Sequence, residues 1–183
     1  GATLVPPYDD DLIIAGQGTA MVEVARDWPE VDVVVVPIGG GGLIGGTAVA
    51  AKHLLPEIAV YGAEPERGND MQQSLRSGHI VSIDVPRTIC DGQQTQSCGV
   101  HTFEVMRTLL AGVLTVPDPV VLQVMCFVFE RLKLVLEPSG ASALAALLLV
   151  CPILAAPAPP LAAQSYDAKL LGEMKWRPIG PLR

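Results

Sequence analysis

The sequence VVVVPIGGGGLIGG, residues 33–46, decides the fold because four consecutive glycines join a buried strand to a helix. The β-branched run at residues 33–36 is typical of a parallel strand covered on both faces, and Pro37 ends its hydrogen-bonding ladder. A helix is expected to begin near Leu43. This stretch therefore predicts a strand, a glycine loop and a helix in direct succession.

The glycine loop has the features of an anion site. Without a Cβ atom, a glycine amide can turn inward and approach an anion closely. The N-terminus of the following helix adds a partial positive charge at the same point. A plain tight turn would need only one or two glycines. We therefore expect the loop to bind phosphate through Gly39, Gly40, Gly41 and Gly42.

Composition narrows the function classes. The 183 residues are 50% hydrophobic and 17% charged, which suits one domain of ordinary size with a large core. The net charge of −7, with no cluster of Lys or Arg, argues against a nucleic acid or an anionic membrane as partner. The cysteines lack CxxC spacing, so we expect reduced thiols and a cytoplasmic protein. These cysteines are Cys90, Cys98, Cys126 and Cys151.

Residues 138–166 contain no charged side chain and could suggest a membrane span. The apolar stretch at residues 139–151 ends at Pro152, however, and further prolines follow at 157, 159 and 160. A span needs ~20 apolar residues in succession. We expect a buried helix here, and the N-terminus shows no secretory signal.

Strands and helices alternate along the chain. We expect a helix at residues 19–27, a second strand at 58–63 and a third at 113–116. Asp118 is expected to cap a helix at residues 120–133, with Pro119 at its first position. This order predicts an α/β fold with a parallel sheet, in which residues 64–70 form a polar loop.

The sequence of the glycine loop is also compatible with a second kind of ligand, a dinucleotide. Gly40, Gly42 and Gly45 satisfy GxGxxG, the dinucleotide-binding pattern. Glu64 lies about 20 residues further on, where that fold places the acid that binds the ribose hydroxyls. A Rossmann-type NAD-binding oxidoreductase is therefore an alternative on local grounds.

Other segments carry a resemblance to a known family. GATLVPPYDDDLIIAGQGT (residues 1–19), the glycine loop, AEPERGND (63–70), TICDGQQTQ (88–96) and ERLKLVLEPSGA (130–141) occur in that order. They resemble the serine racemase, threonine (serine) dehydratase and hydroxyaspartate ammonia-lyase branch of the fold-type-II pyridoxal-phosphate enzymes. TICDGQQTQ is most similar to the hydroxyaspartate members. The resemblance covers residues 1 to about 150 and implies a tryptophan synthase β-like, parallel-sheet fold.

The resemblance implies a pyridoxal 5′-phosphate site and a metal site. It places Gly39–Gly42 at the cofactor phosphate, and it puts Asp91, Gly92 and Glu137 near the cofactor ring. In family members that a divalent cation activates, the residues corresponding to Glu64, the Gly68 carbonyl and Asp70 bind Mg²⁺, Mn²⁺ or Ca²⁺. Two carboxylates with a carbonyl oxygen between them also suit such hard cations on local chemistry. The alternative for this segment is a solvated acidic turn.

Two features of the family are missing. Its Schiff-base lysine lies in a segment of the SxKxRGA kind, and no lysine here has that context, neither Lys52 and Lys133 nor Lys169 and Lys175. The serine-asparagine loop that holds the substrate carboxylate is also absent, as if the chain began where the second half of a family member begins. We therefore expect no catalytic residue within this chain.

The far end departs from the family as well. After Ala146 the family continues to a strand and an SGGN segment, whereas this chain continues with a Pro/Ala-rich sequence. We expect residues 1–150 to be the larger-domain portion of the enzyme, incomplete, and residues 151–183 to be a divergent, poorly ordered tail. Ser139 and Ser142 are not substitutes for the serine of SGGN.

The resemblance implies an ammonia-lyase (dehydratase) or a racemase. Its substrates would be small amino acids, namely serine, threonine or 3-hydroxyaspartate, from which the Cα proton is removed before the hydroxyl leaves. Family members are usually homodimers. A non-catalytic fragment or paralogue that still binds phosphate or pyridoxal phosphate is the second hypothesis, and the NAD-binding oxidoreductase is the third.

Overall fold

The computed structural model describes residues 2–150. Three parallel strands form its sheet in the order β1 (Val33–Pro37), β2 (Ala59–Pro65) and β3 (Gly112–Val116). Val33 pairs with Ala59 across β1 and β2, and Tyr61 pairs with Gly112 across β2 and β3. The α/β fold with a parallel sheet is therefore confirmed.

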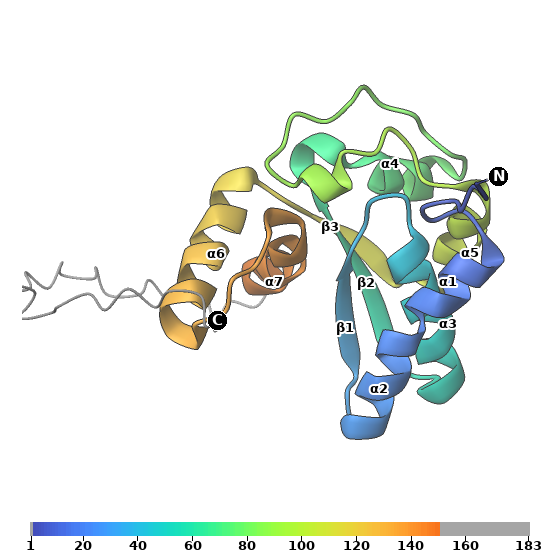
Figure 1. The fold of residues 1–183 in the computed structure, drawn as a ribbon, viewed down its shortest axis with the longest axis horizontal. Helices are drawn as coiled ribbons and strands as arrows, with labels where there is room; N and C mark the ends of the chain where they lie inside the picture. The colour runs from blue at the N-terminus through green and yellow to red at the C-terminus, as the bar shows by residue number, and fades with distance from the viewer. Residues whose placement is uncertain (1, 151–183) are drawn as a thin grey trace, which may run out of the picture.

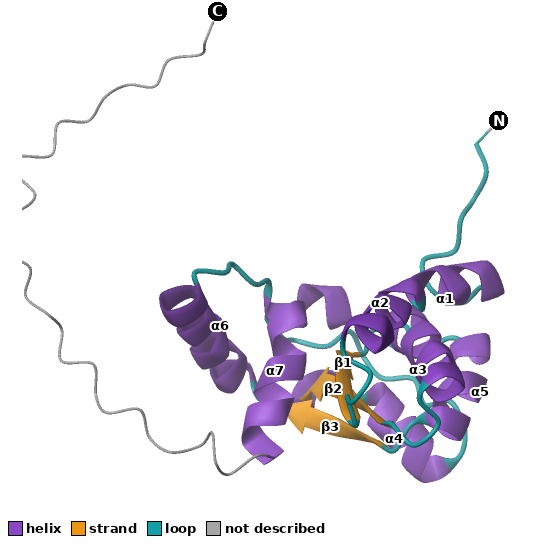
Figure 2. Cartoon of the chain, turned by 90° about the horizontal axis from the view of Figure 1, so that it is seen from below, coloured by secondary structure: helices purple, strands orange, loops and turns teal. Residues whose placement is uncertain are grey.

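Helices cover both faces of this sheet (Figures 1 and 2). On one face lie α2, α3 and α5, with α1 packed against α3. On the other, α7 contacts all three strands and α6 packs on α7. The helices are α1 (Asp11–Gln17), α2 (Thr19–Asp27), α3 (Gly42–Leu54), α4 (Asp70–Ser77), α5 (Val100–Leu109), α6 (Asp118–Leu132) and α7 (Pro138–Val150). Two short 3-10 turns, η1 (Glu66–Gly68) and η2 (Asp91–Gln93), interrupt the loops.

Each face has its own apolar core. Successive strand residues point to opposite faces, so Val60 joins the core under α2, α3 and α5, while Ala63 joins the core under α6 and α7. The largest fully buried side chains of the first core include Ile44 of α3 and Met106 of α5. The two cores fix α3 and α7 on opposite sides of the carboxyl end of β1, where the glycine loop begins.

The structure corrects three local expectations. Val33 is 44% exposed, so β1 is not covered on both faces along its whole length. Glu64 is not in a polar loop but inside β2, fully buried. Asp118 does not cap a helix from outside, because it is the first residue of α6 and its carboxylate accepts hydrogen bonds from the Thr88 hydroxyl and the Ile89 amide.

Within residues 2–150, no helix is both long and apolar enough to cross a bilayer. Helix α7 forms where the sequence predicts a buried helix, but only one face of it is buried, because Leu147, Leu149 and Val150 are exposed. Cys90, Cys98 and Cys126 are free thiols, the first two buried. Cys151, the predicted tail at 151–183, Lys169 and Lys175 lie outside the described residues.

Candidate functional site: a cavity at the glycine loop

The glycine loop presents a row of free amides. Among the described residues, nothing accepts a hydrogen bond from the main-chain amides of Gly39, Gly40 and Gly41. Gly41 precedes α3, and no side chain caps this helix, so the amides of its first turn also lack partners. Unpaired amides at a helix N-terminus attract an anion through hydrogen bonds and through the helix dipole.

Thr102 of α5 orients this loop. Its hydroxyl donates to the Gly40 carbonyl oxygen at 2.8 Å, and the Gly99 amide donates to the same oxygen at 3.2 Å. The peptide bond between Gly40 and Gly41 is planar and trans, so its carbonyl and its N–H point in opposite directions. Holding the carbonyl toward α5 therefore turns the Gly41 amide away from α5.

Glycine is required in the loop for packing as well as for anion approach. Gly41 has φ +98°, a backbone conformation that favours glycine. A Cβ atom at Gly41 would lie 2.8 Å from the Thr102 Cβ, and one at Gly39 would lie 2.9 Å from the Gly92 carbonyl oxygen. At Gly40 it would overlap the ring of Tyr8. The neighbouring groups therefore leave no room for a Cβ atom at Gly39, Gly40 or Gly41.

The loop forms one wall of a cavity of about 560 Å³. Its other walls come from the segment before α1, from η2 and from the start of α7. The cavity therefore brings together most residues that the resemblance assigns to the cofactor. The predicted residues that line it are Gly39, Gly40, Gly41, Gly42, Gly92 and Glu137.

The remaining cofactor residue, Asp91, does not line the cavity. Its carboxylate is exposed and accepts a hydrogen bond from the Gly92 amide at 3.0 Å. The Ser139 hydroxyl of α7 accepts from the same amide, also at 3.0 Å. Asp91 and Ser139 thus hold the turn at Gly92, which lines the cavity together with Ser139.

Sequence reasoning missed three residues of this site: Tyr8, Thr102 and Gln93. Tyr8 covers Gly40, and Thr102 orients the loop. Gln93 is 2% exposed, and its side-chain amide donates to the carbonyl oxygens of Ile38, just after β1, and Ala63, inside β2. Gln93 lies in the TICDGQQTQ segment, but nothing in the sequence shows that its side chain turns inward.

The predicted metal residues form a buried acidic pair. Glu64 accepts hydrogen bonds from the Met71 and Gln72 amides of α4, each at 3.0 Å. Burial, and then the neighbouring Asp70 carboxylate, raises the pKa of Glu64 to about 8. Burial likewise raises the pKa of Asp70 to about 6. Asp70 is 1% exposed, and its Oδ2 atom has no hydrogen-bond partner.

The side chains of Glu64 and Asp70 supply only part of the ligand set that a hard cation needs. No group of three or more His, Cys, Asp or Glu side chains within residues 2–150 is placed to hold a metal ion. A cation here would take oxygen ligands from Glu64, Asp70, the buried Gly68 main chain and water. The unpaired Asp70 oxygen is the atom that such an ion would satisfy.

Neither lysine in the described part of the chain reaches the cavity. The Lys52 ammonium donates to the Ile58 carbonyl oxygen at 2.6 Å, and the Lys133 ammonium donates to the Glu130 carbonyl oxygen at 2.8 Å. Both side chains therefore have structural partners away from the glycine loop.

The geometry argues against the dinucleotide alternative. A ribose-binding acid must reach the ligand, but Glu64 is fully buried and both of its oxygens bond to α4. Glu64, the acid that the GxGxxG interpretation requires, therefore bonds to the protein's own amides and does not face a ribose.

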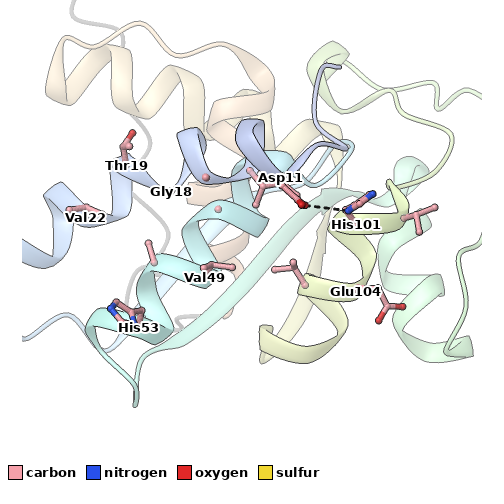
Figure 3. Close-up of a pocket in the computed structure, with 14 residues that line it drawn as sticks. Asp11, Gly18, Thr19, Val22, Val49, His53, His101 and Glu104 are labelled. Atoms are coloured by element: carbon pink, nitrogen blue, oxygen red, sulfur yellow. Dashed lines mark ion pairs between the residues drawn. The ribbon is translucent and has the colours of Figure 1, made fainter. Parts of the chain in front are cut away.

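A larger hollow of about 780 Å³ lies elsewhere, between α1, α2, α3 and α5 (Figure 3). Its lining is mostly apolar, and at one side of it His101 Nδ1 lies 3.3 Å from Asp11 Oδ1. His53 lies at the far end. No predicted site residue lines this hollow, and none of the unpaired buried polar atoms of the described chain borders it.

Comparison with known proteins gives consistent matches. The family model described as pyridoxal-phosphate dependent enzyme matches residues 1–158. A serine racemase of Schizosaccharomyces pombe is 47% identical over 146 residues, which cover 80% of this chain and 45% of the relative. The L-threo-3-hydroxyaspartate ammonia-lyase of Saccharomyces cerevisiae is 47% identical over 149 residues, which cover 81% of this chain and 46% of the relative.

The fold comparison agrees. The solved structure of maize serine racemase matches with a TM-score of 0.79 at 41% identity, over 81% of this chain and 46% of that one. The chain thus spans about half the length of the curated relatives that it matches.

Proposed function

Because the chain belongs to the pyridoxal-phosphate dependent enzyme family, we propose that its glycine-loop cavity holds pyridoxal 5′-phosphate by the phosphate group. We further propose that the whole protein is an ammonia-lyase or a racemase of serine, threonine or 3-hydroxyaspartate. The relatives named above carry serine racemase and L-threo-3-hydroxyaspartate ammonia-lyase in their names, and threonine is added from the sequence resemblance. The observation that carries the proposal is the row of unpaired amides at Gly39, Gly40 and Gly41, inside one cavity.

The chain's own residues have distinct tasks in this proposal. The loop amides and the N-terminus of α3 bind the phosphate, and Thr102 fixes the direction of the Gly41 amide. Tyr8 covers the loop and limits the access of water, while Gly92 and Glu137 face the rest of the ligand. Bound pyridoxal phosphate supplies an electron sink, which lets a proton leave the Cα atom of an amino acid.

The divalent cation belongs to the same proposal. Two buried carboxylates with raised pKa values, one with an unpaired oxygen, are destabilising without a countercharge. A Mg²⁺, Mn²⁺ or Ca²⁺ ion at Glu64, Gly68 and Asp70 would supply that charge. The ion would also hold together the segment that connects β2 to α4.

We assign no proton-transfer step to residues 2–150, since neither described lysine lines the cavity. In this proposal the described residues supply the phosphate-binding part of the site. A homodimer and a cytoplasmic location stay predictions from sequence.

A titration tests the proposal against the NAD-binding alternative. Calorimetry would measure binding of pyridoxal 5′-phosphate, inorganic phosphate and NAD to the full chain. We expect roughly millimolar pyridoxal-phosphate binding, because a few amide contacts each contribute about 1.5–3 kcal/mol before binding entropy is lost. Inorganic phosphate should compete with it. Tight NAD binding, or pyridoxal-phosphate binding that phosphate does not displace, would contradict the proposal.

A further inference from the structure

The side chain of Gln93 binds the main chain at the point where β1 ends. Its Nε2 atom donates to the Ile38 carbonyl oxygen at 2.9 Å and to the Ala63 carbonyl oxygen at 2.8 Å. The opposite orientation of the amide would set its oxygen against two carbonyl oxygens with no proton between them. Both hydrogens of Nε2 are therefore used on the main chain, one at Ile38 and one at Ala63.

The contact with Ile38 replaces a hydrogen bond that the sheet cannot make. The register of the parallel pair sets Pro37 opposite Ala63, and the Ile38 amide donates to the Ala63 carbonyl oxygen at 2.9 Å. The next donor along the ladder, to the Ile38 carbonyl oxygen, would be the amide of residue 65, but Pro65 has no N–H. Within the described chain, Gln93 supplies the only donor to this carbonyl oxygen. The side chain therefore fixes the direction of a buried carbonyl group.

The Ile38 carbonyl belongs to the same peptide as the Gly39 amide. That peptide is planar and trans, so a carbonyl held toward Gln93 turns the Gly39 N–H in the opposite direction. Gly39 lines the glycine-loop cavity, and nothing in the described chain accepts a hydrogen bond from its amide. Gln93 thus has the same relation to the Gly39 amide that Thr102 has to the Gly41 amide.

We propose that Gln93 is a positioning residue, which holds the Gly39 amide toward the bound anion without touching the anion itself. The inference rests on the proposed function. It adds that two side chains from different elements, Gln93 of η2 and Thr102 of α5, each orient one amide of the loop. They act on different peptides, Ile38–Gly39 and Gly40–Gly41, so their effects on anion binding are independent.

The wild-type chain provides a first test, in an NMR titration with inorganic phosphate. An anion that accepts from the Gly39 amide polarises its peptide and strengthens the bond from Gln93 to the Ile38 carbonyl oxygen. The side-chain amide hydrogens of Gln93 should therefore shift with the same apparent affinity as the Gly39 amide. Gln94 is the control, because its exposed Nε2 atom donates to the Thr88 carbonyl oxygen at 2.8 Å, and its hydrogens should not shift.

Variants give the second test. Gln93→Met keeps the length of the side chain but loses both donors, and it should weaken phosphate binding by roughly threefold to tenfold. It should reduce the phosphate-induced shift at Gly39 and retain the shift at Gly41, whereas Thr102→Val should do the reverse. The affinity loss of the double variant should equal the product of the two single losses. Gln94→Met, the same change one residue further on, should bind phosphate as the wild type does.

Three results would overturn the inference alone, in a wild-type chain that binds phosphate at the loop. One is a shift at Gly39 without a shift at the Gln93 side chain. The others are unchanged phosphate affinity in Gln93→Met, or an equal loss of the Gly39 and Gly41 shifts in that variant. If Gln93→Met does not fold, the wild-type comparison of Gln93 with Gln94 decides. Failure of the wild-type chain to bind phosphate would overturn the proposed function together with the inference.

Discussion

Thr102 shows how one side chain can determine the direction of an anion-binding amide without touching the anion. It holds the carbonyl of a glycine peptide, and the planarity of that peptide turns the next amide the other way. Thr108, six residues further along α5, makes the same type of bond, from its hydroxyl to the Glu104 carbonyl oxygen at 2.8 Å, but is exposed. The two threonines form a natural test and control.

Thr102→Val should weaken the binding of inorganic phosphate by roughly threefold to tenfold, the net value of one hydrogen bond. The physical reason is that the Gly40 carbonyl keeps only the Gly99 amide and the Gly41 amide is less well oriented. Thr102→Ser should restore the affinity, and Thr108→Val should leave it unchanged. Equal phosphate affinity in Thr102→Val and Thr108→Val would remove Thr102 from the site.

At the residue scale, the sequence predicts several of the residues that meet at the cavity but not how they are used. The glycines and Glu137 reach one cavity as the resemblance implies. The burial of Glu64 was not predictable, because a strand-end acid is expected to be solvated. Here two amides of α4 offset only part of its desolvation, so its pKa stays raised. Gln93 and Thr102 could not be found either, since polar residues in loops and helix starts are usually exposed.

At the scale of elements, Asp9 links the N-terminal segment to α5. Its carboxylate accepts hydrogen bonds from the Val100, His101 and Thr102 amides at 3.0, 2.8 and 3.3 Å. It therefore caps a helix that lies about 90 residues away in sequence, as a local N-cap residue would. Asp10 caps α1 locally, through the Leu12 and Ile13 amides.

Asp9→Ala and Asp10→Ala should each lower the free energy of unfolding by about 1–2 kcal/mol, measured by urea denaturation. Only Asp9→Ala should also weaken phosphate binding, because α5 positions Thr102 at the glycine loop. If phosphate affinity falls equally in both variants, the effect is one of general stability, and the coupling from Asp9 through α5 to the loop is wrong.

The cation is expected at residues 64–70, where β2 is connected to α4. Millimolar Ca²⁺ or Mg²⁺ should raise the melting temperature, since a ligand that binds only the native state stabilises it by mass action. Glu64→Gln should abolish this increase. Glu66→Gln, which changes an exposed acid of η1, should retain it. A wild-type melting curve that does not respond to the cation would show that residues 64–70 bind none.

At the scale of the whole molecule, two cores on opposite faces of one sheet create the site at the carboxyl ends of β1 and β2. The order of the strands and of helices α2, α3, α6 and α7 was predictable because Gly or Pro marks most of their boundaries, but helix α1 was not predicted. The closure of the cavity was not, because it depends on contacts distant in sequence. Tyr8 meets Gly40, and the Gly92 turn bonds to Ser139.

The most direct measurement is an amide nitrogen–proton NMR titration of the full chain with inorganic phosphate. The account predicts that the largest shifts occur at the free amides of Gly39, Gly40 and Gly41. Gly78, whose amide bonds to the Ser74 carbonyl oxygen at 2.9 Å, should not shift. Shifts confined to the apolar hollow between α1 and α5, or no saturable shift at the three loop glycines, would contradict the claim that the glycine loop is a phosphate site.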